Sequence, residues 1–278
     1  MYNNQKEGDS DGHETSLLNL LGESPEWVRL PYPPPFFICY TQLVGILDFI
    51  FPKHCVSCKK LGEYICADCF SMISFNPYEI CLVCNRGSID GLTHPFCKTR
   101  YSIDGAFTSI SYKGIVKKLV YEFKYKPFVS NLCNILVDLM YEGLIQKELF
   151  IKAIEQFSNE TIALVPIPLY KSKLRRRGYN QAQLLAQGLS KKLNIPTIDM
   201  LLRVKNTPSQ VGLERKKRIE NITGAFSVAP NPSADGSQYP NIFLVDDVLT
   251  TGSTLLEAAN VLKRNGAKKV WGIALARD

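Results

Sequence analysis

The sequence predicts an α/β protein in which strands alternate with helices, preceded by a small cysteine-rich module. Apolar runs at 161–168 and 242–245 are too short for helices and are rich in strand formers, and a helical pattern follows each of them. Four regularly spaced pairs of metal-binding side chains between residues 55 and 97 predict the module. With 278 residues and 45% hydrophobic content, the chain can bury a substantial core and hold more than one domain.

The N-terminal part of the chain carries no signal for chemistry. Residues 1–35 are polar, acidic and then proline-rich, so we expect a mostly disordered extension that reaches to about residue 40. The apolar stretch 36–51 contains Asp48 and is too short and too polar for a spanning helix. No basic region precedes an apolar core, so we expect no signal peptide, no membrane span and a cytoplasmic protein. A short amphipathic helix is favoured by the spacing of Leu43, Ile46, Leu47 and Ile50.

The stretch 52–100 holds seven of the nine cysteines, in three Cys-x2-Cys pairs and one His-x2-Cys pair. Two tandem groups of four such ligands fit two tetrahedral zinc sites without an open position, which are structural rather than catalytic. The predicted zinc ligands are Cys55, Cys58, Cys66, Cys69, Cys81, Cys84, His94 and Cys97. A single zinc ion remains an alternative to two, and His54 competes with His94 as a ligand. Cys39 and Cys133 lie in apolar helical patterns and are interpreted as small buried hydrophobes.

Downstream of the cysteines, a strand is predicted over 107–112, and apolar side chains at helical spacing predict helices around 116–123 and 132–139. The run TIALVPIP at 161–168 predicts a strand with a rigid exit, because proline forbids a helix there. A further helix is expected to begin near Asn180, and a last strand to follow Gly266.

Two basic segments favour an anionic ligand. Lys171, Lys173, Arg175, Arg176 and Arg177 lie between a strand end and a helix start, where α/β proteins bind ligands, and Arg177 and Gly178 are the preferred participants. The second segment, 203–228, predicts either a mobile loop that closes over the ligand or a basic surface hairpin. The net charge is +7, and residues 1–53 carry three basic and seven acidic side chains, so the remainder carries +11.

The stretch 241–270 is the most informative one. Its apolar run ends in Asp246 and Asp247, and a helix with Leu255 and Ala258 on its apolar face follows. Between them lie the small residues Thr250, Thr251, Gly252, Ser253 and Thr254. A glycine, several hydroxyls and the N–H groups of a helix N-terminus together favour a phosphate. The two carboxylates would repel it unless they bind ribose hydroxyls or a divalent cation beside it. A plain turn with Thr254 as N-cap is the alternative.

The run LVDDVLTTGST closely resembles the motif with which type I phosphoribosyltransferases bind 5-phosphoribosyl 1-pyrophosphate (PRPP). The cysteine pairs, VPIP, RRRGYNQA, the spacing of Gln210, Leu213, Arg218 and Asn221, and LVDDVLTTGST occur in the order typical of the ComF family. This resemblance to a family of competence-associated proteins extends from about residue 43 to the end. It implies a short helix plus double zinc ribbon at 41–103, after an extension at 1–40. It also implies a type I phosphoribosyltransferase-like domain at 104–278, a mostly parallel sheet flanked by helices. His94-x2-Cys97 departs from the family's fourth Cys-x2-Cys, and imidazole is an acceptable zinc ligand.

The resemblance also implies a PRPP–Mg²⁺ site. In it Asp246 and Asp247, the candidate catalytic residues, contact the ribose hydroxyls, residues 250–254 hold the 5-phosphate, and Arg176 and Arg177 meet the pyrophosphate. The implied role is DNA uptake in natural transformation or nucleotide metabolism, with the DNA-uptake machinery as a partner. Two hypotheses follow: a phosphoribosyltransferase with an unidentified acceptor, or a non-catalytic module that binds PRPP, another phosphorylated small molecule such as a nucleotide, or single-stranded DNA. Binding of DNA is expected to be salt-sensitive and to depend on Arg175, Arg176, Lys216 and Lys217.

Overall fold

The computed structural model describes residues 53–125, 130–156, 161–207, 215–230 and 238–278. The chain divides into two compact units, residues 1–51 and 52–278, and all described residues belong to the second. The extension expected at 1–40, the amphipathic helix expected at 43–50 and Cys39 therefore lie outside the described residues. The domain boundary expected after residue 103 stays a prediction, because the second unit contains both segments that it separates.

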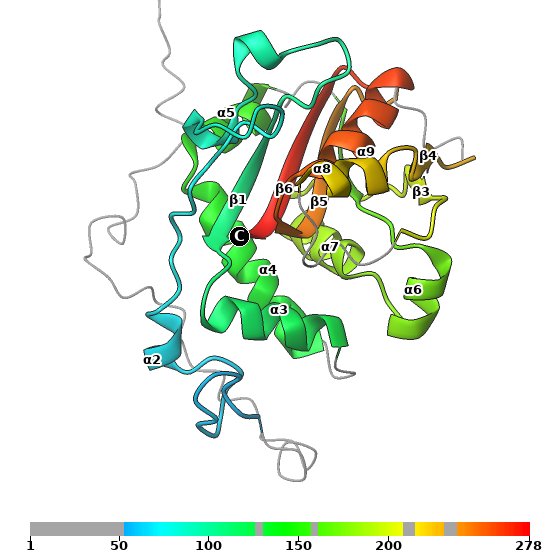
Figure 1. Ribbon diagram of the computed structural model, residues 1–278. Coiled ribbons are helices and arrows are strands. Elements are labelled where there is room, and N and C mark those ends of the chain that lie inside the picture. Colours follow the sequence, from blue (N-terminus) through cyan, green and yellow to red (C-terminus); the bar gives the residue numbers. More distant parts are fainter. Residues whose placement is uncertain (1–52, 126–129, 157–160, 208–214, 231–237) are drawn as a thin grey trace, which may run out of the picture. The chain divides into compact units, whose positions relative to one another are not determined.

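A four-stranded parallel sheet lies at the centre of this unit (Figure 1). Its strand order is β1 (Gly105–Ser111), β6 (Lys269–Arg277), β5 (Asn241–Leu249) and β2 (Ile162–Pro166). The register pairs Thr108 with Ala274 and Leu164 with Phe243. Because all neighbours are parallel, their carboxyl ends meet at one edge of the sheet. The four strands confirm the predicted fold class.

Helices cover both faces of the sheet. Successive apolar side chains of a buried strand point to opposite faces, so each face needs a covering layer. On β5, Phe243 and Val245 belong to one buried cluster, whereas Ile242 and Leu244 belong to the other. The first cluster includes residues of α3 (Ile115–Tyr125), α4 (Ser130–Ile145), α5 (Glu148–Gln156) and α7 (Gln181–Leu193). The second includes residues of α9 (Ser253–Arg264), β3 (Leu201–Arg203), α8 (Arg215–Ile222) and β4 (Phe226–Val228).

Two basic segments differ from the expectation. The run expected as a loop forms the short helix α6 (Lys171–Arg177), which ends at Gly178 with φ +81°. The segment 203–228 is neither a loop throughout nor a hairpin: β3 and β4 pair antiparallel, and α8 lies between them in the chain. Residues 208–214, with Gln210 and Leu213, lie outside the described residues.

The cysteine-rich segment has little regular structure, namely α2 (Ala67–Phe70) and the 3-10 turns η4 (Ile89–Gly91) and η5 (Pro95–Cys97). Its apolar side chains nevertheless join the main core: Val56 lies in the first buried cluster, and Ile80 and Leu82 lie in the second. Among the described helices, none combines the length and the apolar character that crossing a membrane requires.

Candidate functional site

The cysteine-rich segment forms two groups of metal-binding side chains. Within each group the ligand atoms lie within 4.8 Å of one another. The first comprises Cys55, Cys58, Cys66 and Cys69, and the second Cys81, Cys84, His94 and Cys97. A tetrahedral zinc site with bonds of about 2.3 Å has sulfur–sulfur edges of roughly 3.8 Å. The Cys58 Sγ–Cys66 Sγ distance of 3.5 Å and the Cys84 Sγ–His94 Nδ1 distance of 3.3 Å fit this geometry. Both groups are compatible with zinc, and His94, not His54, completes the second.

The thiols in each group differ in their readiness to ionise. Burial raises the pKa of Cys55, but hydrogen bonds from the backbone of Cys66, Cys58 and Ser57 lower it overall to about 6. Burial and the neighbouring thiols raise the pKa of Cys69 to about 12. In the second group the pKa of Cys81 is lowered, because backbone hydrogen bonds outweigh its burial, and that of Cys97 is raised to about 11 by burial and its neighbours. Packed thiols resist full ionisation without a cation, and a coordinated metal ion would remove these protons.

The acidic pair lies within β5 and not at its end. Pairing with β2 stops where Pro166 meets Val245, whereas pairing with β6 continues from Asp246 opposite Ala274 to Leu249 opposite Arg277. The expectation that the strand ends at the carboxylates is therefore wrong, because β6 supports β5 beyond the end of β2. Asp246 and Asp247 consequently lie at the carboxyl edge of the sheet, in the part of β5 that extends beyond the end of β2.

Strand alternation sends the two carboxylates toward opposite faces. Asp247 continues the row of Phe243 and Val245 and meets α3, where Lys124 Nζ lies 2.8 Å from its Oδ1. The Lys124 and Asp247 side chains are only 22% and 12% exposed. Burial acts to lower the pKa of Lys124, but the charge and hydrogen bond of Asp247 raise it overall. Asp247 is thus held by a mostly buried cation that the sequence pattern did not predict.

Asp246 continues the other row, toward β3. Burial and the Asp247 carboxylate raise the pKa of Asp246 to about 7, against the opposing effects of the Asp247 backbone N–H, Lys124 and Arg203. Burial lowers the pKa of Arg203, and the charge of Asp246 opposes this change. Arg203 therefore lies within electrostatic reach of Asp246.

The turn after β5 opens α9 without a side-chain cap. Gly252 is the N-cap residue, with φ +73°, and has no side chain that could accept a hydrogen bond, so Thr254 is not the N-cap. Thr251 Oγ1 and Ser253 Oγ lie 3.1 Å apart, and Ser253 is buried. The first N–H groups of a helix have no partner within the helix, and here the N-cap residue cannot supply one.

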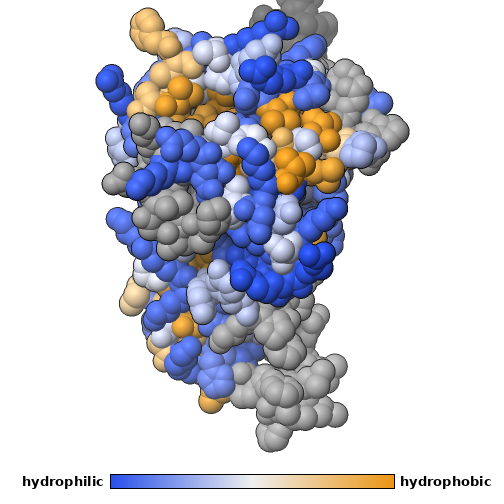
Figure 2. All heavy atoms as spheres, turned by 45° about the vertical axis from the view of Figure 1, so that its right-hand side comes forward, coloured by the Kyte–Doolittle hydropathy of each residue, from blue (hydrophilic) through white to orange (hydrophobic). Residues whose placement is uncertain are grey.

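Cations from α6 and β3 gather in one region. Lys173 Nζ donates to Thr207 O at 2.9 Å, and Arg203 donates to the hydroxyl of the same buried threonine. Burial lowers the pKa of Lys173, and the charges of Arg203, Arg177 and Arg176 lower it further. Figure 2 shows that the side of the molecule with α6, β3 and α8 is covered mainly by hydrophilic residues, with an apolar patch toward its upper part.

Three buried donors in this region have no hydrogen-bond partner within the described part of the chain. They are Arg177 Nε, Gln181 Nε2 and Arg203 Nε. Arg177 still donates from Nη1 to Gln181 Oε1 at 2.9 Å and lies over the Tyr125 ring at 5.3 Å. Leaving a buried donor unsatisfied costs about 1–3 kcal/mol, so donors of this kind are well placed to meet an anion or ordered water.

The RGYNQA block has a structural explanation. Asn180 caps α7 by accepting from Ala182 N at 3.2 Å, and its Nδ2 donates to Ile167 O at 3.0 Å, just after β2. The Tyr179 hydroxyl donates to Phe123 O in α3. These bonds fix the exit of β2 against α7 and α3, and thereby fix the position of the basic helix α6.

Sequence reasoning did not identify Lys124, Arg203 or Gln181 as members of this region. Gln181 carried a signal, because it is a polar residue next to the apolar face of the predicted helix and is only 1% exposed. Lys124 is one of several lysines off the apolar face of α3, and Arg203 ends a strand of three residues. Nothing in their local pattern distinguishes them from surface cations.

Comparisons with known proteins agree with this geometry. Residues 144–278 match the phosphoribosyl transferase domain family. Competence protein F of Haemophilus influenzae is 47% identical over 117 residues, which cover 41% of this chain and 50% of that protein. DNA utilization protein YhgH of Escherichia coli is 36% identical over 115 residues, 41% of this chain and 48% of that protein. Competence protein ComFC of Bacillus subtilis is 28% identical over 230 residues, 79% of this chain and 86% of that protein. The chain thus spans about half the length of the first two relatives.

The parallel sheet flanked by helices, with an acidic pair and a glycine-capped turn at its carboxyl edge, agrees with the match of residues 144–278 to the phosphoribosyl transferase domain family. In front of it lie two cysteine-rich groups compatible with a zinc ribbon. In this organisation the chain resembles competence protein F and competence protein ComFC, as its motifs predicted.

Proposed function

We propose that this protein binds PRPP together with Mg²⁺ at the carboxyl edge of its sheet and acts in DNA uptake. The role in uptake rests on the names of its relatives, which are competence and DNA utilization proteins. In the proposed complex the turn 250–254 holds the 5-phosphate, Asp246 and Asp247 contact the ribose hydroxyls, and Arg176 and Arg177 meet the pyrophosphate.

The observation that carries the proposal is the uncapped N-terminus of α9 beside the acidic pair. Gly252 adopts the positive φ that this turn requires, and the hydroxyls of Thr251 and Ser253 already lie together there. The cations around Thr207 and the unsatisfied donors of Arg177, Gln181 and Arg203 add positive charge and hydrogen-bond donors nearby. This combination suits a ligand with two separate phosphate groups joined by a ribose.

If the protein is an enzyme, the reaction is a substitution at C1 of the ribose. The bond from C1 to the pyrophosphate oxygen breaks, its electron pair leaves with pyrophosphate, and an acceptor atom forms a new bond to C1 and gives up a proton. Bound Mg²⁺ would neutralise charge on the departing pyrophosphate. This chain's own residues would orient the ribose and stabilise the leaving group, which are contributions from positioning and electrostatics.

Calorimetric titration of the zinc-loaded protein with PRPP and Mg²⁺ tests the binding. We expect binding that is lost in Asp246→Ala and in a Thr251→Ala, Ser253→Ala double variant, whereas Lys152→Ala in the exposed part of α5 serves as the control. Equal affinity in all four proteins would refute the proposed site. Release of pyrophosphate in the presence of a panel of bases then separates the enzyme from the module: tight binding without turnover favours the module.

A second candidate function, binding of single-stranded DNA, is favoured by an exposed aromatic pair on α3. Tyr121 and Tyr125 are 59% and 54% exposed, and their ring centroids lie 5.0 Å apart. A groove of about 380 Å³ beside Tyr121 is lined by Lys59, Lys117 and Lys118 among others. Aromatic rings next to cations are the means by which proteins stack unpaired bases and follow their backbone.

Fluorescence anisotropy with a labelled oligothymidine tests this function. We expect an affinity that falls with salt and falls about tenfold or more in a Tyr121→Ala, Tyr125→Ala double variant, since stacking contributes about 1–3 kcal/mol per base. Tyr78→Ala, which removes another exposed tyrosine, is the control. An affinity that is indifferent to salt and to the α3 tyrosines would exclude this surface.

A further inference from the structure

The second metal-ligand group lies directly under the proposed phosphate turn. Leu82 stands between its ligands Cys81 and Cys84 and is fully buried. It belongs to the same buried cluster as Leu249 and Leu255, the apolar residues on either side of the turn. A Cβ atom added to Gly252 would lie 2.8 Å from Leu82 Cδ2 and within 3.2 Å of two further Leu82 carbons. The turn therefore packs against the side chain of Leu82, and the metal ligands on either side of Leu82 fix the position of its backbone.

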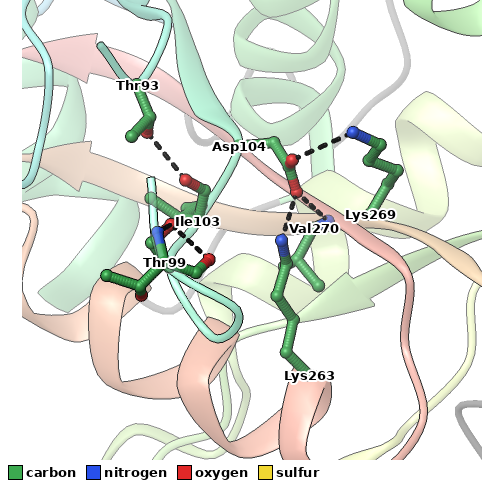
Figure 3. Close-up of polar contacts among 8 residues, drawn as sticks. Thr93, Thr99, Ile103, Asp104, Lys263, Lys269 and Val270 are labelled. Carbon is green, nitrogen blue, oxygen red and sulfur yellow. Dashed lines mark hydrogen bonds and ion pairs between the residues drawn. The ribbon is translucent and has the colours of Figure 1, made fainter. Parts of the chain in front are cut away.

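A second connection joins the same group to the other end of α9 (Figure 3). Thr93, next to the ligand His94, donates to Ile103 O at 2.7 Å and from its backbone to Asp104 O at 3.0 Å. Asp104 accepts from Val270 N at 2.9 Å, and its carboxylate lies 2.7 Å from Nζ of Lys263 in the last turn of α9. Asp104 and Lys263 are only 9% and 7% exposed. Segment 79–104 thus contacts both ends of α9, through Leu82 at the first turn and through Asp104 at the last.

The upstream side of this segment is fixed as well. Glu79 forms an ion pair of 2.7 Å with Lys147, in which both side chains are 10% exposed, and accepts from Thr108 of β1 at 3.1 Å. The first ligand group differs: the corresponding residue between its first two cysteines, Val56, belongs to the buried cluster that includes α3 and α4. Of the two described groups, the second thus has Leu82 beside Gly252, whereas Val56 of the first lies in the other buried cluster.

We propose that a metal ion held by Cys81, Cys84, His94 and Cys97 positions the phosphate turn through Leu82, so that metal binding and PRPP binding strengthen each other. Without the ion, the Cys81–Cys84 pair and the His94–Cys97 pair would separate. Leu82 would then lose its fixed position beside Gly252. Coupling between two sites is reciprocal, so PRPP must raise the affinity for this ion by the same factor as the ion raises the affinity for PRPP. Leu82 is a positioning residue, and the inference rests on the proposed PRPP site.

The test measures the equilibrium transfer of zinc to a chromogenic chelator, with and without PRPP and Mg²⁺. We expect PRPP to raise the affinity for one ion per chain about fivefold or more, the lower end of usual coupling between sites, and to leave the affinity for the other unchanged. Leu82→Ala is expected to abolish this increase, and Leu82→Met, which keeps the volume, to retain most of it. Val56→Ala, the matched change in the first group, is expected to leave the increase intact.

Hydrogen exchange provides a readout that does not require PRPP. Amides of 249–256 are expected to exchange faster once both ions have been removed by a chelator, and faster in Leu82→Ala than in Val56→Ala. If calorimetry shows PRPP binding but the affinities for both ions are unchanged, the coupling is refuted and the proposed function stands. If PRPP does not bind, the proposed function fails and the coupling to PRPP fails with it; unchanged exchange of 249–256 would then also exclude positioning of the turn by the metal.

Discussion

The ion pair between Lys124 and Asp247 should be one of the strongest polar interactions at the edge of the sheet. At an N–O distance of 2.8 Å and an effective dielectric constant near 20, the gross attraction is about 6 kcal/mol. Removing two side chains that are only 22% and 12% exposed from water offsets much of this energy. We therefore expect a net coupling of about 2–3 kcal/mol, within the range that double-mutant cycles give for close, desolvated charge pairs.

A double-mutant cycle with Lys124→Met and Asp247→Asn measures this coupling. Urea unfolding of the zinc-loaded protein gives the free energy of unfolding of the four proteins, and methionine keeps much of the packing of the lysine stem. Repulsion between Asp247 and Asp246 is present with and without Lys124, so it largely cancels in the cycle. The double variant should lose less stability than the sum of the losses in the two single variants, and the difference is the coupling.

The matched control is a second lysine of α3. Lys117 lies 3.8 Å from the Asp278 carboxylate, and the two side chains are 55% and 52% exposed. Exposed pairs contribute about 0–1 kcal/mol and weaken with salt, whereas the Lys124–Asp247 coupling should persist in 0.5 M salt. A coupling below about 0.5 kcal/mol, equal to that of the control, would refute the conclusion that Lys124 neutralises Asp247 in a desolvated environment.

Three further outcomes are expected. The pKa of Asp246 is about 7 in the fold and about 4 in an unfolded chain, so this group makes the fold less stable as pH rises from 4 to 7. Asp246→Asn should remove up to about 4 kcal/mol of that loss. The same dependence of melting temperature on pH in both proteins would contradict this expectation. Gly252→Ala should cost roughly 2–4 kcal/mol, because positive φ and contact with Leu82 add, whereas Gly178→Ala, at φ +81° in open space, should cost about 1 kcal/mol by the same unfolding measurement. Elemental analysis should find two zinc ions per chain, and chelation should lower the melting temperature; metal content near zero would exclude the zinc assignment.

The features predicted from sequence are those whose cause is local. The apolar run before Asp246 and the glycine-containing turn after it are encoded by adjacent residues, and the metal ligands recur at fixed short spacing. For this reason the four strands of the parallel sheet, the turn and both ligand groups, including His94, could be located from the sequence.

The features that were not predicted depend on packing between distant segments. Lys124 matters because α3 crosses the edge of the sheet beside Asp247, and Arg203 because β3 lies near Asp246. The basic run 171–177 was expected as a loop because it lies between a strand end and a helix start. It forms a short helix that ends at Gly178, and Lys173 reaches the backbone of Thr207. No spacing rule connects residues so far apart in the chain.

The acidic pair posed a physical problem, because two carboxylates beside a phosphate site should repel the ligand. Their positions in the fold reduce that problem, since they point toward opposite faces of the sheet and meet different partners. Lys124 compensates Asp247, and a pKa of about 7 leaves Asp246 partly protonated near neutral pH. Lys124 and the raised pKa of Asp246 therefore offset part of the negative charge of the pair. Because Arg203 also acts on Asp246, it further reduces the repulsion that an anionic ligand meets at the turn.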